Sequence, residues 1–187
     1  CEQLPAVFAG KRLLEVACGT GFWTQFIAPV AREVVALDAA PATMEIAARR
    51  VPAAKVHFVV GDAYALPTEL GPFDAAFAGF WFSHVPLARQ REFLLGLAGV
   101  LATGAAVVLL DNRFVEGSST PLAETDADGN TYQQRLLDDG TTHRVLKNFP
   151  DEARLRAVVE GLGEQVELQL LEYYWVLHYR AITGPRP

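Results

Sequence analysis

The chain has 187 residues, of which 51% are hydrophobic and 20% charged, a composition typical of a globular protein with a substantial core. Its formal net charge of −6 weighs against nucleic acid or an anionic membrane as a partner held through a broad basic surface. No apolar run is long enough to cross a membrane and no signal peptide is visible, so we expect a cytoplasmic protein. Cys1 and Cys18 are then expected to be free thiols, and a chain that opens on Cys1 is expected to lack its native N-terminus.

Apolar runs and helical patterns alternate regularly over the first 111 residues. Strands are predicted at residues 12–17, 34–38, 55–60, 73–79 and 105–110, and helices at 22–30, 41–50 and 87–101. The first helix is expected to place Phe22, Phe26 and Val30 on one face. The strands lack polar alternation, which favours a parallel sheet covered on both sides. The pattern predicts a doubly wound α/β fold, in which ligands bind beyond the carboxyl ends of the strands.

The second part of the chain departs from this alternation. Residues 131–147 have the pattern of a β-hairpin with polar side chains on both faces. This hairpin follows the carboxyl end of the fifth strand, so residues 112–149 are expected to form an inserted flap over the site. A last helix is predicted at 151–162. Residues 166–182 are expected to form two antiparallel strands that reverse near Leu171–Tyr174.

A turn of small residues follows the first predicted strand. The run is Leu14-Glu15-Val16-Ala17-Cys18-Gly19-Thr20-Gly21. Glycines at such a turn let a ligand approach the backbone, and free N–H groups of the next helix face the same space. Dinucleotide-binding turns carry a third glycine, but that position is Thr24, and no basic residue lies nearby for a phosphate. The turn by itself is a weak signal for any one ligand.

Acidic residues at the strand ends narrow the choice of ligand. Asp38 ends the second strand, where a carboxylate can accept both hydroxyls of a ribose. Asp62 follows the third strand and can accept the amine of an adenine, and Glu15 can face a cationic amine. Such a set suits a positively charged adenosine without phosphate, which is S-adenosylmethionine. The alternative for each acid is a turn residue or an ion-pair partner.

These motifs together resemble those of class I S-adenosylmethionine-dependent methyltransferases. The matching segments are Leu14–Gly21, Val35-Ala36-Leu37-Asp38, Val59-Val60-Gly61-Asp62-Ala63 and Phe73-Asp74-Ala75-Ala76-Phe77-Ala78-Gly79-Phe80. Ala17 departs from the pattern, since many members have glycine there, and we expect no loss of binding. The resemblance implies a seven-stranded Rossmann-like sheet of order 3-2-1-4-5-7-6 with an antiparallel seventh strand. It also implies S-adenosylmethionine as cofactor, S-adenosylhomocysteine as product, and no metal.

The resemblance assigns further residues to the cofactor. Gly19 and Gly21 would line its methionine part, and Met44 would pack on the adenine. Ala63 would offer a backbone N–H to the ring, and Phe80 would lie beside the sulfonium.

The segment after the fourth strand is the main candidate for the acceptor side. His84 is a possible general base for an acceptor hydroxyl or amine, or a structural histidine that binds the loop backbone. Trp23 and Trp81 either line the acceptor pocket or pack in the core. Asp111 and Asn112 end the fifth strand facing the site, so we expect one of them to contact substrate.

The flap supplies further candidates. Polar and basic side chains that could grip an acceptor carboxylate or phosphate are Arg113, Tyr132, Arg135, His143 and Arg144. The alternative is a solvated hairpin, which we favour for most of them, and Arg113 and Tyr132 are retained as candidate substrate contacts.

We therefore predict one methyltransferase domain over residues 1–187, with a small-molecule acceptor and transfer by in-line displacement. Three alternatives stay open: a methyltransferase that acts on RNA or protein, a nicotinamide oxidoreductase, and a non-catalytic protein that binds S-adenosylmethionine. The chain is expected to be a monomer or a homodimer.

Overall fold

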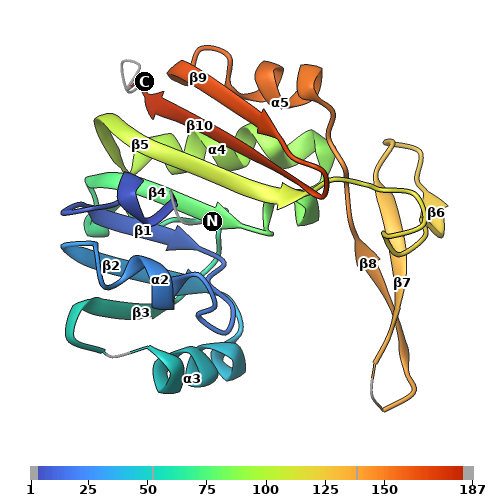
Figure 1. The fold of residues 1–187 in the computed structure, drawn as a ribbon, viewed down its shortest axis with the longest axis horizontal. Helices are drawn as coiled ribbons and strands as arrows, with labels where there is room; N and C mark the ends of the chain where they lie inside the picture. The colour runs from blue at the N-terminus through green and yellow to red at the C-terminus, as the bar shows by residue number, and fades with distance from the viewer. Residues whose placement is uncertain (1–3, 52, 138, 183–187) are drawn as a thin grey trace.

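The computed structural model describes residues 4–51, 53–137 and 139–182, and within them the chain forms a seven-stranded sheet and a small three-stranded sheet (Figure 1). The strands of the large sheet are β1 (Arg12–Val16), β2 (Glu33–Asp38), β3 (Val56–Val60), β4 (Phe73–Gly79), β5 (Leu101–Asn112), β9 (Gly163–Leu170) and β10 (Tyr174–Ala181). Their order is β3-β2-β1-β4-β5-β10-β9, and β10 runs antiparallel to both of its neighbours. Since β9 and β10 are the sixth and seventh strands of this sheet, the predicted order is confirmed.

Helices cover both faces of the sheet. They are α1 (Leu4–Val7), α2 (Thr24–Ile27), α3 (Pro41–Arg50), α4 (Gln90–Gly99) and α5 (Glu152–Val159). On one face, Phe93 of α4 and Leu155 of α5 belong to a buried cluster that includes Leu14. On the other, Phe8 and Ile27 pack in a second buried cluster with strand residues such as Leu13. Leu13 and Leu14, which are adjacent on β1, are therefore buried on opposite faces of the sheet, as expected for a central parallel strand.

The first predicted helix is much shorter than expected. Only Thr24–Ile27 is helical, and its buried residues are Thr24 and Ile27. Phe22 and Phe26, expected on one apolar face, are 51% and 49% exposed. At the C-terminal end the sequence reason is Pro29, which lacks the N–H needed to continue the helix, although Ala28 before it still has helical angles.

The boundary between the third predicted helix and the fifth strand is also different. Helix α4 ends at Gly99 and β5 already begins at Leu101, four residues before the predicted start. A register shift between Phe73 and Ala75 of β4 accompanies this early start. Gly104 has a φ of +76°, a left-handed position inside the strand that glycine adopts readily.

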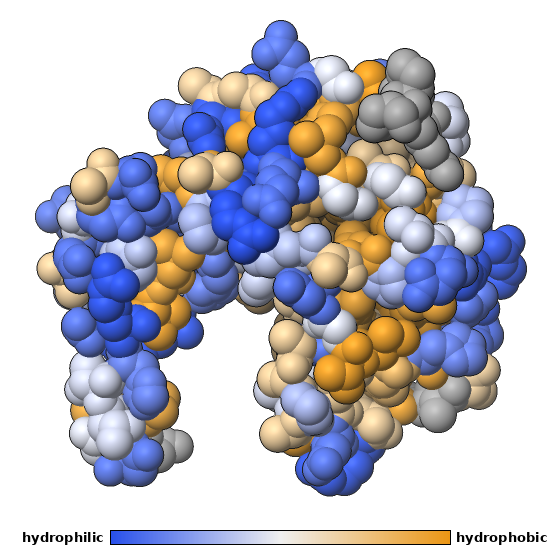
Figure 2. All heavy atoms as spheres, turned by 180° about the vertical axis from the view of Figure 1, so that it is seen from behind, coloured by the Kyte–Doolittle hydropathy of each residue, from blue (hydrophilic) through white to orange (hydrophobic). Residues whose placement is uncertain are grey.

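The predicted hairpin is present, and a third short strand joins it. The small sheet consists of β6 (Glu124–Thr125), β7 (Thr131–Leu136) and β8 (Thr142–Leu146), in that order. It lies beyond the carboxyl ends of the parallel strands (Figure 1). Figure 2 shows a broad cleft between this arm and the body of the molecule. The hairpin thus overhangs the edge at which such sheets bind ligands.

The last predicted elements are present too. Asp151 caps α5 by accepting a hydrogen bond from the backbone N–H of Arg154 at 2.8 Å. Strands β9 and β10 reverse at residues 171–173, as predicted. Within the described ranges, no helix combines the length and the apolar character needed to span a membrane.

Candidate functional site

The turn after β1 contains three residues with left-handed backbone angles. The φ angles are +55° at Ala17, +54° at Gly19 and +74° at Gly21. A Cβ at Gly19 would meet no atom within 4 Å, so this position borders open space. A Cβ at Gly21 would lie 3.0 Å from the Cβ of Ala47, so Gly21 lets α3 approach the turn closely. The two predicted glycines therefore have different roles: Gly19 leaves space for a ligand beside the backbone, and Gly21 allows α3 to pack against the turn.

Glu15 is a buried carboxylate directly before this turn. It is 2% exposed, and its Oε2 has no hydrogen-bond partner among the described residues. Burial raises the pKa of Glu15 to about 8. A buried acid without a partner costs stability, which is a pattern more typical of a binding site than of a structural residue.

The two predicted strand-end acids lie at the same edge. Asp38 accepts hydrogen bonds from the backbone N–H of Gly19 at 2.8 Å and of Ala40 at 2.9 Å. It therefore connects the carboxyl end of β2 to the glycine turn of β1. Asp62 is exposed, and its Oδ1 accepts a hydrogen bond from the N–H of Tyr64 at 2.9 Å. Each carboxylate oxygen can accept more than one hydrogen bond, so both side chains can still accept from hydroxyl or amine donors at this edge of the sheet.

Three other residues predicted on the cofactor side come from α3, from the turn after β3 and from the end of β4. Met44 and Ala63 are both buried. Phe80 has a φ of +58°, and its N–H donates to the carbonyl oxygen of Leu110 at 2.8 Å. A left-handed aromatic residue is strained, and such strain is found preferentially at functional sites.

A row of aromatic rings runs along the strand ends, formed by Trp23, Phe80 and Tyr174. The ring centroid of Phe80 lies 6.0 Å from that of Trp23 and 5.9 Å from that of Tyr174. A Cβ at Gly79 would come within 2.8 Å of the Trp23 indole, so that glycine makes room for it. The row connects the neighbourhood of the glycine turn with the space below the hairpin.

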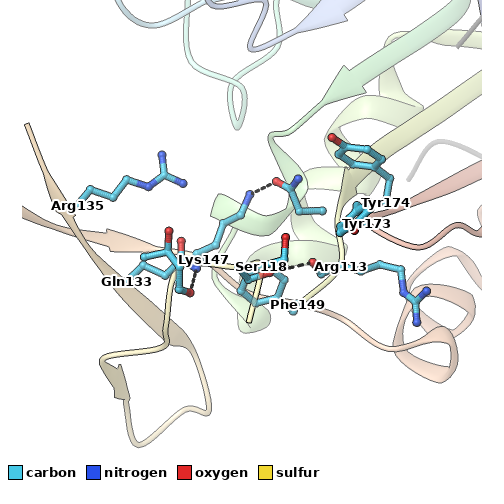
Figure 3. A pocket seen from close by; sticks show the side chains of 11 residues that line it. Arg113, Ser118, Gln133, Arg135, Lys147, Phe149, Tyr173 and Tyr174 are labelled. Carbon is cyan, nitrogen blue, oxygen red and sulfur yellow. Dashed lines mark hydrogen bonds between the residues drawn. The ribbon is translucent and has the colours of Figure 1, made fainter. Parts of the chain in front are cut away.

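That space contains a cavity of about 250 Å³. It is lined by three basic side chains, five hydroxyl groups, two amides and Phe149. The basic residues are Arg113, Arg135 and Lys147. Figure 3 shows Arg135 and Lys147 reaching toward the sheet edge from the hairpin side, whereas Arg113 points away from them. Arg113 instead donates a hydrogen bond to the carbonyl oxygen of Leu171.

Lys147 belongs to a buried polar cluster that ties the hairpin to β5. Its Nζ donates to Ser83 Oγ at 2.7 Å, to Asp111 Oδ1 at 3.1 Å and to Asn112 Oδ1 at 3.0 Å. Asp111 is fully buried and also accepts from the N–H of Ser83 at 2.8 Å. Of the two predicted strand-end residues, Asn112 lines the cavity and Asp111 lies beneath it as the counter-charge of Lys147.

His84 bridges to the hairpin. Its Nδ1 lies 2.7 Å from the carbonyl oxygen of Leu146, and because a carbonyl can only accept, the Nδ1–H is the donor. Burial and the nearby Lys147 ammonium lower the pKa of His84, so the ring is neutral at pH 7 with its lone pair on Nε2. This hydrogen bond gives His84 a structural role, because it fixes the loop after β4 to the hairpin. His84 is not among the described residues that line the cavity.

The remaining acceptor candidates lie apart from the cavity. Trp81 packs against Tyr64 and Phe93. The Tyr132 hydroxyl donates to Asp126 at 2.9 Å, and the Arg144 guanidinium lies 3.3 Å from the centre of the Tyr132 ring. Those contacts hold the outer face of the hairpin together.

Sequence reasoning missed Lys147 and Gln133 as cavity residues. Both are buried although they belong to the polar hairpin. The only signal for Lys147 in the sequence was its place at the end of the hairpin, close to the apolar pair Phe149-Pro150. Whether a hairpin residue faces the sheet depends on how the arm folds back, which periodicity does not report.

Sequence comparisons identify the family. A methyltransferase-domain family model matches residues 13–104. The demethylmenaquinone methyltransferase of Thermus thermophilus is 40% identical over 182 residues, covering 88% of this chain and 79% of that protein. The chain belongs to the class I S-adenosylmethionine-dependent methyltransferases. A malonyl-[acyl-carrier protein] O-methyltransferase of Serratia marcescens is 28% identical, and this methyltransferase spans 64% of its length.

Solved structures agree with this family. The methyltransferase superposes on the DhpI–SAM–HEP complex with a TM-score of 0.80 and 28% identity, covering 96% of this chain and 82% of that one. The DhpI–SAH complex gives a TM-score of 0.78 at the same identity. SAM and SAH denote S-adenosylmethionine and S-adenosylhomocysteine.

The residues at the glycine turn fit the cofactor of the family. The partnerless Oε2 of Glu15 suits a cationic amine, and the open space at Gly19 leaves room for a chain beside the backbone. Cys18 is a free, buried thiol in the same turn, and burial raises its pKa to about 12, so the methyltransferase holds it protonated. Cys1 lies outside the described residues. In the part of the chain that the structure describes, no His, Cys, Asp and Glu side chains gather as a metal site would require.

Proposed function

We propose that this methyltransferase transfers a methyl group from S-adenosylmethionine to a small-molecule acceptor bound in the cavity below the hairpin. The observation that carries the proposal is the row of Trp23, Phe80 and Tyr174, which joins the glycine turn to the cavity. Donor and acceptor sites would then share one edge of the sheet. A volume of about 250 Å³ lies just below the range of about 300–1,000 Å³ for drug-sized ligands, which favours a small acceptor.

The cofactor would be held by the acids at the carboxyl edge. In this proposal Glu15 pairs with the amine of its methionine part, Asp38 accepts the ribose hydroxyls, and Asp62 accepts the adenine amine. Met44 and Ala63 supply the buried surface against the adenine, and Phe80 lies beside the sulfonium. Gly19 and Gly21 line the methionine part, Gly21 by allowing α3 to close the turn.

The chemistry asks little of the protein beyond positioning. The cofactor supplies a methyl group that its sulfonium has already activated. The protein must align the acceptor with that methyl group and exclude water, which can account for a large share of the rate. The overhanging hairpin and the aromatic row are placed to do both (Figure 2).

His84 is proposed as the base when the acceptor atom carries a proton, which requires the reacting atom to extend beyond the cavity lining toward the imidazole ring. Its neutral ring keeps the Nε2 lone pair free, because Nδ1–H donates to Leu146. The bond to Leu146 would also hold the ring in one orientation. Trp23, Asn112 and Tyr174 are the proposed contacts of the acceptor, and Arg113 lines the same cavity. Trp81 and Tyr132 are proposed as outer contacts that a closed hairpin would have to bring nearer.

Relatives with small acceptors support this reading. One relative is described as a demethylmenaquinone methyltransferase and another as a ubiquinone biosynthesis O-methyltransferase. The DhpI complex holds a third component, HEP, together with SAM. We extend to this chain only the small size of the acceptor. The acidic net charge supports a cytoplasmic enzyme that does not bind nucleic acid.

The direct test is a transfer assay. The protein is incubated with a metabolite extract and methyl-labelled S-adenosylmethionine, and labelled products are identified by mass spectrometry. We expect a labelled small molecule together with S-adenosylhomocysteine. Label found only in RNA or protein would contradict the small-molecule acceptor, and cofactor binding without any labelled product would favour a non-catalytic role. Stabilisation by a nicotinamide dinucleotide instead of S-adenosylmethionine would indicate an oxidoreductase.

The same assay tests His84. With an acceptor hydroxyl or amine, His84→Ala should lower turnover by 100-fold or more, since a positioned base contributes about 10²–10⁴-fold. His178→Ala is the control, because His178 lies within β10 opposite Val108 and therefore away from the carboxyl ends of the parallel strands and from the hairpin. Unchanged turnover in His84→Ala would show that His84 is not the base and that its role is limited to the hydrogen bond to Leu146.

A further inference from the structure

The cavity below the hairpin has a one-sided chemistry. Its polar lining consists of basic, hydroxyl and amide groups, and none of the described lining residues is acidic. This contrasts with the chain as a whole, whose net charge is −6. A donor-rich, cationic pocket in an acidic protein is a local feature that calls for an explanation in terms of a ligand.

Arg135 is the cation that lacks a partner. It lies on β7 with an exposed side chain, and within the described part of the chain it makes no hydrogen bond or ion pair. It is close enough to Lys147 and His84 to lower the pKa of both. An anion bound beside Arg135 would offset this repulsion and would supply the partner that its guanidinium lacks among the described residues.

The other two basic residues are already neutralised or directed elsewhere. Lys147 pairs with the buried carboxylate of Asp111 at 3.1 Å. Arg113 donates to the carbonyl oxygen of Leu171, and Figure 3 shows its guanidinium pointing away from Lys147 and Arg135. Lys147 is thus neutralised and Arg113 is turned toward Leu171, which leaves Arg135 as the lining cation best placed to bind a ligand in the cavity.

We propose that the acceptor of this methyltransferase carries an oxyanion, a phosphate, phosphonate or carboxylate group, which Arg135 binds in the cavity with help from the surrounding hydroxyl groups. This inference rests on the proposed function, because it names the class of acceptor for that same cavity. The planar guanidinium presents paired N–H donors that match two oxygens of such a group. The hydroxyl groups on the opposite wall can donate to the remaining oxygens.

The test is calorimetric binding to the full chain, with and without saturating S-adenosylhomocysteine. The probes are methylphosphonate, acetate and acetamide, the last being the neutral isostere of acetate. Arg135→Gln removes the charge while keeping a polar side chain. Arg144→Gln is the matched control, since Arg144 lies on the partner strand of the same hairpin, pairs with Glu124 and does not line the cavity. Circular dichroism verifies that both variants fold.

We expect at least one of the two anions to bind tenfold or more tightly than acetamide, and Arg135→Gln to weaken that binding at least tenfold. Arg144→Gln should bind as the unaltered protein does. Preference for methylphosphonate or for acetate then identifies the oxyanion class. If S-adenosylhomocysteine binds but neither anion does, or if Arg135→Gln binds the anion unchanged, the oxyanion proposal is wrong. Failure of S-adenosylhomocysteine itself to bind overturns the proposed function, and the acceptor class with it.

Discussion

At the scale of single residues, the cofactor edge carries features that cost stability. Glu15 is buried with a partnerless oxygen, and Ala17 and Phe80 have left-handed backbone angles. Burial and strain of this kind cost about 1–3 kcal/mol at each site and are usual where a ligand compensates for them. All three residues lie at or beside the ends of β1 and β4, which supports a binding role for this edge.

Glu15 predicts how cofactor binding depends on pH. The ionised carboxylate should pair with the ammonium of S-adenosylhomocysteine. Below pH 8 Glu15 is protonated, since its pKa is about 8. Affinity should therefore rise as the pH approaches 8 from below, by up to tenfold per pH unit, and fall only at the higher pH at which the ammonium of the amino-acid part loses its proton, measured by calorimetry from pH 6 to 10.

The Glu15→Gln variant provides the comparison. Without an ionisable side chain it should bind more weakly at pH 8 and lose the rising limb of the profile. 5′-Methylthioadenosine, which lacks the amine, should show neither limb in the unaltered protein. A flat profile for S-adenosylhomocysteine would show that Glu15 does not face the amine.

Ala17 predicts a stabilising substitution. Its left-handed conformation costs about 1–2 kcal/mol, and glycine adopts it without that cost. Part of the gain is lost because glycine also increases the entropy of the unfolded chain. Ala17→Gly should therefore raise the free energy of unfolding by up to about 1 kcal/mol, measured in urea. The control Ala48→Gly, at an exposed position in the last turn of α3, should lower it by up to about 1 kcal/mol. A loss at both positions would mean that the turn is not strained at Ala17.

At the scale of elements, the hairpin is firmly attached at its base and exposed toward its tip. Asn148 donates its N–H to the carbonyl oxygen of Ser83 at 2.8 Å, next to the buried pair of Lys147 and Asp111. Toward the tip, Leu136 is 74% exposed. Any closing motion of the arm should therefore occur beyond Lys147 and leave the polar cluster intact.

The cluster predicts a strong coupling between two elements. Removing one partner of a buried ion pair leaves an uncompensated charge, so Lys147→Met should cost about 3–5 kcal/mol of unfolding free energy. Combining it with Asp111→Asn should cost clearly less than the sum of the two single variants, because the pair then disappears together. Urea denaturation measures all three.

The control for the cluster is the exposed pair of Arg144 and Glu124, which Arg144→Gln breaks at a cost of at most about 1 kcal/mol. Strictly additive losses for Lys147→Met and Asp111→Asn would contradict the pair as the attachment of the hairpin to β5.

At the scale of the whole molecule, the sequence predicts most of the fold because local and global signals agree. Short apolar runs without alternation favour central strands of a parallel sheet, and the acid that ends β2 falls at the edge where the glycine turn lies. The failures have local causes. Pro29 prevents α2 from continuing, and β5 begins at Leu101 and continues through the left-handed Gly104, before the apolar run that marks the strand in the sequence. The position of the flap and the candidates Arg113 and Arg135 were predictable, whereas the role of Lys147 was not, because it meets Asp111 and Asn112 of β5 only through the folding back of the hairpin.

The proposed transfer, its acceptor class and the role of Glu15 all require that the carboxyl edge of β1 and β2 binds S-adenosylmethionine. A calorimetric titration with S-adenosylhomocysteine tests it most directly, in the unaltered protein, in Asp38→Ala, and in Glu33→Ala at the opposite end of β2. We predict one binding site per chain, at least tenfold weaker in Asp38→Ala and unchanged in Glu33→Ala, since a charge-assisted hydrogen bond contributes about 1.5–3 kcal/mol. Absence of binding, or equal binding by Asp38→Ala and the unaltered protein, would contradict the account.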